Sequence, residues 1–169
     1  MLNDNKTIVA RWFKEFWGNP WNPDIIHELA APDILVHYPM HEPKKGRAVV
    51  SAFMTDFRAA FPDLSFWGVG DLLGEGDYIV SRWEGGGTHT GPAFSDFRMG
   101  SIAAASGRKM HFTGTTILRL QDGHIAEELG QEDALTAMQQ LGLLRPPESH
   151  VGALLGRAPL PPGWNRMKG

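Results

Sequence analysis

Cysteine is absent from the 169-residue sequence. Its absence excludes disulfide bonds, thiolate metal ligands and cysteine nucleophiles. The seven histidines are scattered along the chain, and only His37 and His41 lie close together, separated by a Tyr-Pro break. Metal-binding histidines usually recur at short spacings on one element, so the sequence predicts no metal site.

Long hydrophobic runs and clusters of basic residues are also absent. No apolar stretch approaches the roughly 20 residues that a membrane-spanning helix needs, so we expect no membrane segment. The formal net charge is −3 and lysines and arginines do not cluster, which argues against nucleic-acid binding. The start of the chain, Met1–Lys6, lacks the basic and apolar regions of an export signal. These features together predict a cytoplasmic protein.

Hydrophobic residues are plentiful, at 42% of the chain against 21% charged residues, which is typical of a globular protein. The length suits one domain. Six Trp and nine Phe supply large apolar surfaces, which fill cores and often line sites for small hydrophobic ligands. Beyond residue 144 the chain becomes proline-rich and loses its periodicity. We therefore predict a single domain over residues 1–144 and an extended, proline-rich arm over residues 145–169.

The pattern of apolar residues predicts helices first and long strands afterwards. Trp12, Phe13 and Phe16 follow the spacing of a helix that ends near Gly18. Similar patterns predict helices over residues 23–29, 46–60 and 134–141. Strand-forming residues predict strands over residues 34–38, 64–73, 78–90, 109–121 and 124–132. This order indicates an α+β fold, a cone in which a curved antiparallel sheet encloses a pocket and the N-terminal helices pack on it. The long connection over residues 91–108 predicts a lid or an edge flap.

The register of the last two strands follows from Asp122-Gly123, a strong signal for a two-residue hairpin turn. Leu120 would then lie opposite Ile125, and opposed residues share a face of the sheet. The face with most apolar residues, including Met110, Phe112 and Leu118, would be the inner one. On that register Glu127, Leu129, Gln131 and Asp133 point into the pocket. His111, Glu128 and Glu132 point to solvent.

The inward acids need a physical reason, because burying a carboxylate without a partner costs several kcal/mol. Arg82 on the neighbouring strand is the candidate partner of Glu127. Asp133 lies where strand becomes helix, so it could serve as the helix N-cap instead of lining the pocket.

Several motifs then occur in order along residues 5–144. They are Phe61-Pro62-Asp63-Leu64, Arg82-Trp83, Gly87-Thr88-His89-Thr90-Gly91, Arg119-Leu120 with Asp122-Gly123, and Asp133 followed by Gln140-Leu141-Gly142. On these motifs the sequence resembles the SnoaL-like polyketide cyclases, also called ester cyclases, of the NTF2-like superfamily. The chain differs from the small aromatic polyketide cyclases in its 91–108 loop and its proline-rich tail.

The resemblance implies a cofactor-independent enzyme that closes a ring in a hydrophobic, polyketide-like carbonyl substrate by intramolecular aldol condensation. It implies that Asp133 is the acid/base residue. A donor must then stabilise the enolate, and His37 and His89 are the candidates, with Arg82 as a further catalytic candidate. His27 and His41 look like surface residues. The candidate substrate-binding residues are Tyr38, Phe53, Phe57, Trp67, Glu84, Phe112, Glu127, Leu129 and Gln131.

Two other functions remain open on the same scaffold, because one fold hosts many chemistries. Arg82 and Glu84, with an acid on the last strand, are similar to the arginine-flanked acids of limonene-type epoxide hydrolases. This favours an epoxide hydrolase, or another hydrolase or dehydratase. A non-catalytic module that binds a small hydrophobic molecule would also need only an apolar pocket with a few polar groups. A homodimer is expected through the convex sheet face, around Thr113, Thr115, Ile117 and Ala126.

Overall fold

The computed structural model describes residues 2–144. The arm predicted over residues 145–169 lies outside the described residues. The helical segments are α1 (Leu2–Trp12), a π-helical turn η1 (Phe13–Trp17), α2 (Ile25–Leu29), α3 (Arg47–Ala60) and α4 (Ala134–Gln140). The strands are β1 (Ala30–His37), β2 (Lys44–Lys45), β3 (Ser65–Gly68), β4 (Leu73–Glu75), β5 (Tyr78–Thr88), β6 (Phe94–Phe97), β7 (Gly100–Ile102), β8 (Lys109–Gln121) and β9 (His124–Glu132).

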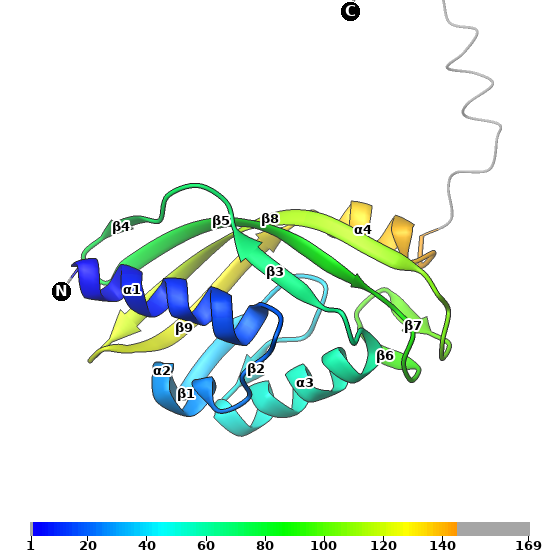
Figure 1. Ribbon diagram of the computed structural model, residues 1–169, viewed down its shortest axis with the longest axis horizontal. Helices are drawn as coiled ribbons and strands as arrows, with labels where there is room; N and C mark the ends of the chain where they lie inside the picture. The colour runs from blue at the N-terminus through cyan, green and yellow to red at the C-terminus, as the bar shows by residue number, and fades with distance from the viewer. Residues whose placement is uncertain (1, 145–169) are drawn as a thin grey trace, which may run out of the picture.

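Seven of the strands form one curved sheet in the order β2-β1-β9-β8-β5-β3, with β4 also paired to β5. The sheet arches over α1, α2 and α3, and α4 lies at its opposite side (Figure 1). The α+β architecture and the curved sheet with N-terminal helices on it confirm the sequence prediction. The sheet is mixed, however, because β1 and β9 run parallel. No helix within residues 2–144 has the length and apolar character to cross a membrane.

Most predicted elements occur near their predicted places. β1 begins at Ala30 and not at residue 34, and the short strand β2 was not predicted. The strand predicted over residues 64–73 is interrupted, and becomes β3 and β4. The long connection over residues 91–108 contains the two-stranded hairpin β6–β7, which forms a separate small sheet. This hairpin packs on the segment after β1: His41 bridges Phe97, and the Arg98 N–H donates to the Met40 carbonyl at 2.9 Å.

The predicted register of the β8–β9 hairpin holds only next to its turn. Gln121 pairs with His124 and Leu120 with Ile125, but Arg119 then pairs with Glu127. Ala126 is therefore the extra residue of a β-bulge, and a shift of one residue moves every later side chain of β9 to the other face. The inner face of β8 is as predicted, with Met110, Phe112, Leu118 and Leu120 buried. On β9, Glu128, Gly130 and Glu132 point inward, so the predicted facing of this strand was wrong.

A buried arginine fixes the helices under the sheet. The Arg58 guanidinium on α3 donates to the carbonyls of Phe16, Gly18 and Leu64 at 2.8–2.9 Å. The first two of these carbonyls come from the end of η1, where helical carbonyls lack intrahelical partners. Burial lowers the pKa of Arg58 to about 10. The contact ties η1 to α3, and both elements contribute aromatic side chains to the pocket described below.

Candidate functional site

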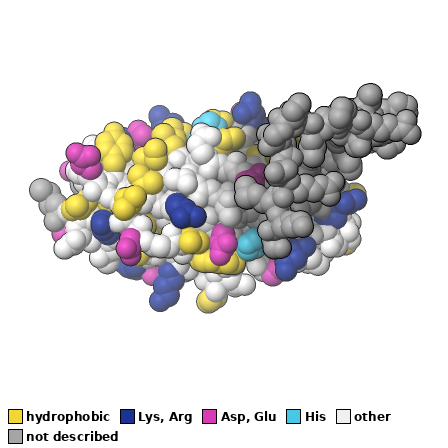
Figure 2. Space-filling view, turned by 90° about the horizontal axis from the view of Figure 1, so that it is seen from above, with side chains coloured by type: hydrophobic (Ala, Val, Ile, Leu, Met, Phe, Trp, Pro, Cys, Tyr) yellow, Lys and Arg dark blue, Asp and Glu magenta, His cyan; other side chains and the backbone are white. Residues whose placement is uncertain are grey.

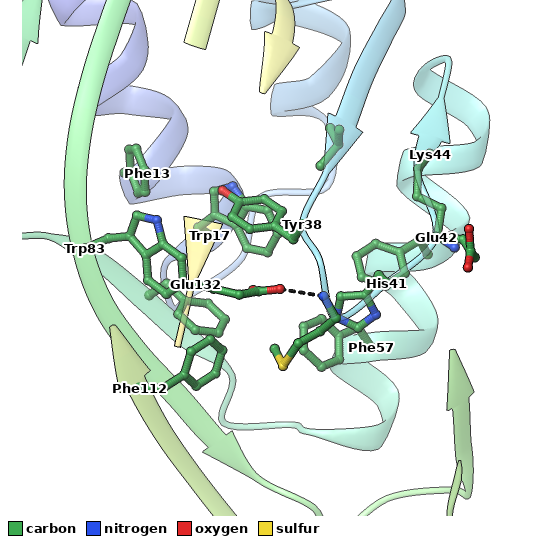
Figure 3. Close-up of a pocket in the computed structure, with 14 residues that line it drawn as sticks. Phe13, Trp17, Tyr38, His41, Glu42, Lys44, Phe57, Trp83, Phe112 and Glu132 are labelled. Carbon is green, nitrogen blue, oxygen red and sulfur yellow. Dashed lines mark hydrogen bonds between the residues drawn. The ribbon is translucent and has the colours of Figure 1, made fainter. Parts of the chain in front are cut away.

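A pocket opens between the concave face of the sheet and the helices η1 and α3. Its lining is mostly aromatic, with four polar or charged side chains (Figure 3). The lining residues are Phe13, Trp17, Val36, Tyr38, Met40, His41, Glu42, Lys44, Phe53, Phe57, Phe66, Trp83, Phe112 and Glu132. The free cavity is small, about 30 Å³, which is room for about two water molecules. A substrate larger than this must therefore push the walls apart.

Glu132, the last residue of β9, places its carboxylate inside this pocket. Its side chain reaches across the pocket toward the segment after β1, with Trp83 and Phe112 on one side (Figure 3). Oε1 accepts a 2.7 Å hydrogen bond from the Met40 backbone N–H, and no hydrogen bond of the described residues uses Oε2. Burial raises the pKa of Glu132 to about 7, although the Met40 hydrogen bond opposes the shift. A carboxyl group with this pKa is suited to take up and release protons near neutral pH.

Glu128, four residues earlier on the same strand, is fully buried behind the pocket. Its Oε2 accepts from Trp12 Nε1 at 2.8 Å, and its Oε1 accepts from Trp17 Nε1 at 2.7 Å and from the Tyr38 hydroxyl at 2.6 Å. Burial raises the pKa of Glu128 to about 6, and the three hydrogen bonds oppose that rise. The carboxylate thus anchors the polar ends of three rings, two of which line the pocket.

A chain of hydrogen bonds continues from Glu128 to the pocket wall. Because the Tyr38 hydroxyl gives its only proton to Glu128, it must accept from Thr116 Oγ1, 2.9 Å away. Thr116 Oγ1 in turn accepts from Trp83 Nε1 at 2.7 Å. Burial and the Glu128 charge raise the pKa of Tyr38 well above its usual value, so the hydroxyl stays protonated. The chain therefore holds Tyr38 and Trp83 in fixed orientations, with their ring faces toward the pocket.

Two strand glycines make room for these rings. A Cβ atom on Gly130 would lie 2.0 Å from Tyr38 Cε1, and one on Gly114 would lie 2.2 Å from Trp83 Cζ2. Gly114 also pairs with Glu132 across β8 and β9. Any larger residue at either position would push a ring off the inner face of the sheet. The glycines therefore let the sheet present flat aromatic surfaces next to the Glu132 carboxylate.

His41 lines the pocket from the segment after β1, and the β6–β7 hairpin holds its ring. Its Nδ1 lies 3.0 Å from Asp96 Oδ2, and Asp96 Oδ1 accepts from Lys44 Nζ at 2.7 Å. Burial alone would raise the pKa of Asp96, but hydrogen bonds from His41 and Lys44 lower it overall. Phe53, Phe57 and Phe97 contact the His41 ring at centroid distances of 4.9–5.4 Å. The prediction that His41 is a surface residue was wrong, since its exposed fraction is 6%.

Asp133, the predicted acid/base residue, lies outside this pocket on the exposed side of the sheet. Its Oδ1 accepts from the Thr136 backbone N–H at 3.0 Å, which makes it the N-cap of α4. Hydrogen bonds from Thr136 lower the pKa of Asp133. The bulge at Ala126 is the cause, because it exchanges the faces of the later residues of β9. The alternative interpretation of Asp133, as a helix cap, agrees with this geometry.

The other predicted catalytic residues also lie away from the pocket. His37 is half-buried and pairs with Leu129 on β9, on the face opposite Tyr38. His89 is fully buried, and its ring nitrogens lie 2.9 Å from Ser106 Oγ and 2.8 Å from the Pro92 carbonyl. It thus fastens both ends of the 91–108 connection. Arg82 is exposed, and its predicted partner Glu127 pairs instead with Arg119, at 2.8 Å.

Of the predicted substrate-binding residues, the structure brings four into the pocket: Tyr38, Phe53, Phe57 and Phe112. The other five lie on the outer face. Trp67 donates from Nε1 to Glu84 at 3.2 Å, and Glu127, Leu129 and Gln131 follow the outward side of β9 after the bulge.

Arg82, Glu84, Gln131 and Asp133 do come together, but in a groove on the outer face of the sheet, which Trp83 and Glu132 also border. Asp133 and Arg82 are exposed there. An exposed acid keeps its water shell, so Asp133 is not the desolvated carboxylate that an epoxide hydrolase needs.

The lining residues that the sequence prediction missed include Glu132, His41, Lys44, Trp17 and Trp83. One signal for the correct facing was present: Gly114 and Gly130 in the middle of long strands indicate a close approach. Placing both glycines on the same inner face requires the shifted register that also turns Glu132 inward. The hydrogen bond between His41 and Asp96 joins residues 55 apart in the sequence, and no local pattern predicts it.

Comparisons with known proteins agree with this fold. The SnoaL-like polyketide cyclase family matches residues 7–141. A protein from Jannaschia sp. CCS1, described as a SnoaL-like polyketide cyclase, is 24% identical; the match covers 85% of this chain and 95% of that one, with a TM-score of 0.69. A protein from Bacillus cereus ATCC 10987, described as a polyketide cyclase, is 25% identical over 84% of this chain and 83% of that one, with a TM-score of 0.64.

A third solved structure names the fold. It is a hypothetical protein with a ketosteroid isomerase-like fold from Catenulispora acidiphila DSM 44928, 18% identical, with a TM-score of 0.62 over 81% of this chain and 93% of that one. The comparison with curated proteins finds no match. The family match spans most of the described residues and includes every strand that contributes to the pocket. The chain therefore belongs to the SnoaL-like polyketide cyclase family, as its motifs predicted.

Proposed function

We propose that this protein is a cyclase-type enzyme that uses Glu132 as the general base on a small hydrophobic carbonyl substrate. The observation that supports this most is the position of the Glu132 carboxyl group. It lies inside an aromatic pocket with one hydrogen bond from the described residues, and burial raises its pKa to about 7. Proton abstraction next to a carbonyl needs a desolvated base of this kind.

The proposed reaction uses the pocket in two steps. Glu132 Oε2 takes a proton from the carbon next to a carbonyl, and the electron pair moves to the carbonyl oxygen as an enolate. The enolate carbon then bonds to a second carbonyl carbon of the same molecule, and the new alkoxide oxygen takes up the proton from Glu132. The rings of Trp17, Tyr38 and Trp83 would hold the substrate flat and exclude water.

Exchange of a ketone's α-protons tests the first step without knowledge of the natural substrate. We expect the protein to accelerate exchange of the C1 protons of 2-tetralone in D₂O, followed by ¹H NMR at neutral pH. Glu132→Gln keeps the shape of the side chain and the Met40 hydrogen bond but removes the base. It should lower the exchange rate by about 10²–10⁴-fold, the usual contribution of a general base.

Asp133→Asn is the matched control, because asparagine caps helices as well as aspartate does. It should leave exchange unchanged. Exchange that survives in Glu132→Gln and disappears in Asp133→Asn would refute the role of Glu132. If 2-tetralone stabilises the protein against heat while the intact protein catalyses no exchange, the pocket is a ligand-binding module instead.

We also propose that two copies of the chain associate through the outer face of the sheet. Large hydrophobic side chains remain exposed there, including Trp67, Ile117 and Leu129 at 39–47%. Figure 2 looks onto this side of the molecule and shows hydrophobic side chains that are interspersed with polar and charged ones. Light scattering should give a dimer mass for the intact chain and a monomer mass for Ile117→Glu. A monomer for the intact chain at micromolar concentration would contradict this proposal.

A further inference from the structure

The proposed enolate needs a donor, and the pocket contains one side chain placed to supply it. His41 is the only histidine among the lining residues of the described chain. Its backbone follows directly after Met40, whose N–H holds Glu132 Oε1. Figure 3 shows the His41 ring beside the end of the Glu132 side chain. The base and the imidazole therefore border the same space, as an acid/base pair requires.

Asp96 determines which nitrogen of His41 can act. The pKa of Asp96 is lowered, so its carboxylate is ionised. Asp96 Oδ2 therefore accepts a hydrogen bond from His41 Nδ1–H, with the two atoms 3.0 Å apart. Its other oxygen, Oδ1, is held by Lys44 at 2.7 Å, which fixes the orientation of the carboxylate. With Nδ1–H donated to Asp96, Nε2 is the ring nitrogen left to face a substrate. No hydrogen bond of residues 2–144 uses Nε2, so this nitrogen is available to a substrate.

We propose that His41 is the catalytic partner of Glu132, donating from Nε2 to the substrate oxygen as charge develops, and that Asp96 is its positioning residue. This inference rests on the proposed function of Glu132. It also assigns a role to the 91–108 connection, since Asp96 lies on β6 of that hairpin. The substrate class becomes narrower: the oxygen beside the reacting carbon must reach His41 while that carbon faces Glu132, as in a ketone or a β-keto ester with its rings between Trp83 and Phe57.

The step balances as a proton transfer. The α-proton moves to Glu132 Oε2, and the electron pair moves from the breaking C–H bond to the carbonyl oxygen. The step uses His41 with both ring nitrogens protonated: Nδ1–H donates to Asp96, and Nε2–H stabilises the substrate oxygen by a hydrogen bond or transfers its proton to give the enol. In D₂O, Glu132 exchanges its proton with solvent and returns a deuteron to carbon, and the enol returns its proton to His41 Nε2, which restores both residues.

Two probes separate the roles of the two residues. Exchange of 2-tetralone needs both a base and a donor, because the enolate charge is concentrated on one oxygen. Elimination of 5-nitrobenzisoxazole needs mainly a base, because its phenolate product spreads the charge into the nitro group. His41→Phe keeps the ring packing against Phe53 and Phe57 and removes the donor. We expect it to lower kcat for exchange by about 100-fold, the usual effect of losing one donor to an oxyanion, and to change elimination less than about threefold.

His41→Gln restores an N–H donor and should recover part of the exchange rate. Asp96→Asn should lower exchange by about tenfold, with elimination again nearly unchanged. Equal losses in both reactions would mean that these residues only shape the pocket, and would overturn the inference. Retained exchange in a folded His41→Phe, with exchange still lost in Glu132→Gln, would also overturn it while leaving the proposed function intact. Exchange retained in Glu132→Gln would refute the proposed function itself.

Discussion

Two buried carboxyl groups on the inner face of β9 show how one strand can provide both an anchor and a reactive group. Glu128 and Glu132 both come after the bulge and point toward the core. Glu128 is fully buried and accepts hydrogen bonds from Trp12, Trp17 and Tyr38. Glu132 accepts one, from the Met40 backbone, and borders the cavity.

The number of donors separates the two roles. Each hydrogen bond to a carboxylate favours the ionised form, whereas burial favours the neutral form. Glu128, with three donors, has a pKa of about 6 despite complete burial. Glu132 is less enclosed, yet burial raises its pKa to about 7 because a single hydrogen bond opposes it. The Glu128 carboxylate, with three donors, is inaccessible to substrate. The Glu132 carboxylate has one oxygen without a hydrogen bond from the described residues, and this oxygen can accept a proton.

Replacing Glu128 should have the greatest effect on the free energy of unfolding. Glu128→Ala leaves two indole N–H groups and the Tyr38 hydroxyl without their acceptor, and each unsatisfied buried donor costs about 1–3 kcal/mol. We expect the free energy of unfolding to fall by at least about 3 kcal/mol, measured by urea denaturation. Glu127→Gln is the control on the outward face and should change it little. A similar stability for Glu128→Ala and Glu127→Gln would contradict the anchoring role.

The next effect is a pH dependence of the free energy of unfolding, which Glu132 should cause. Glu132 has a folded pKa of about 7 against an ordinary value of 4.5, so it binds its proton more tightly when folded. The unfolded chain releases this proton first as pH rises, and stability is therefore lost between about pH 4.5 and 7. At about 1.4 kcal/mol per pKa unit the loss is on the order of 3 kcal/mol. Urea denaturation at pH 8 should show Glu132→Gln to be more stable than the intact protein, and denaturation at pH 4 should show no difference. Equal stability at pH 8 would mean that Glu132 is solvated.

The smallest effect concerns the residue just after β9. Asp133→Ala removes the N-cap of α4 and should lower the melting temperature by about 2–4 °C. Proton exchange of 2-tetralone should continue at the original rate, because Asp133 lies on the outer face. Loss of exchange without loss of stability would return Asp133 to the role that the family resemblance implies.

The sequence predicted the elements and the family well, and it failed at one residue of register. The periodicity of β8 correctly places Phe112 and Leu118 inside, because that strand is regular. The bulge at Ala126 could not be predicted, because the stretch Glu127–Gly130 alternates poorly and either face is acceptable locally. Only partners distant in sequence, such as Trp12 and Tyr38, make the inward position of Glu128 favourable. Four aromatic lining residues were therefore predicted, and the acid between them was not.

The most direct test of the account is a titration of the glutamate side-chain carboxyl carbons by ¹³C NMR. One resonance should have a midpoint near pH 7 and should disappear in Glu132→Gln. A second, with a midpoint near pH 6, should disappear in Glu128→Gln. If the resonance near pH 7 persists in Glu132→Gln, or if every glutamate titrates near its ordinary value, Glu132 is not the desolvated base of this pocket.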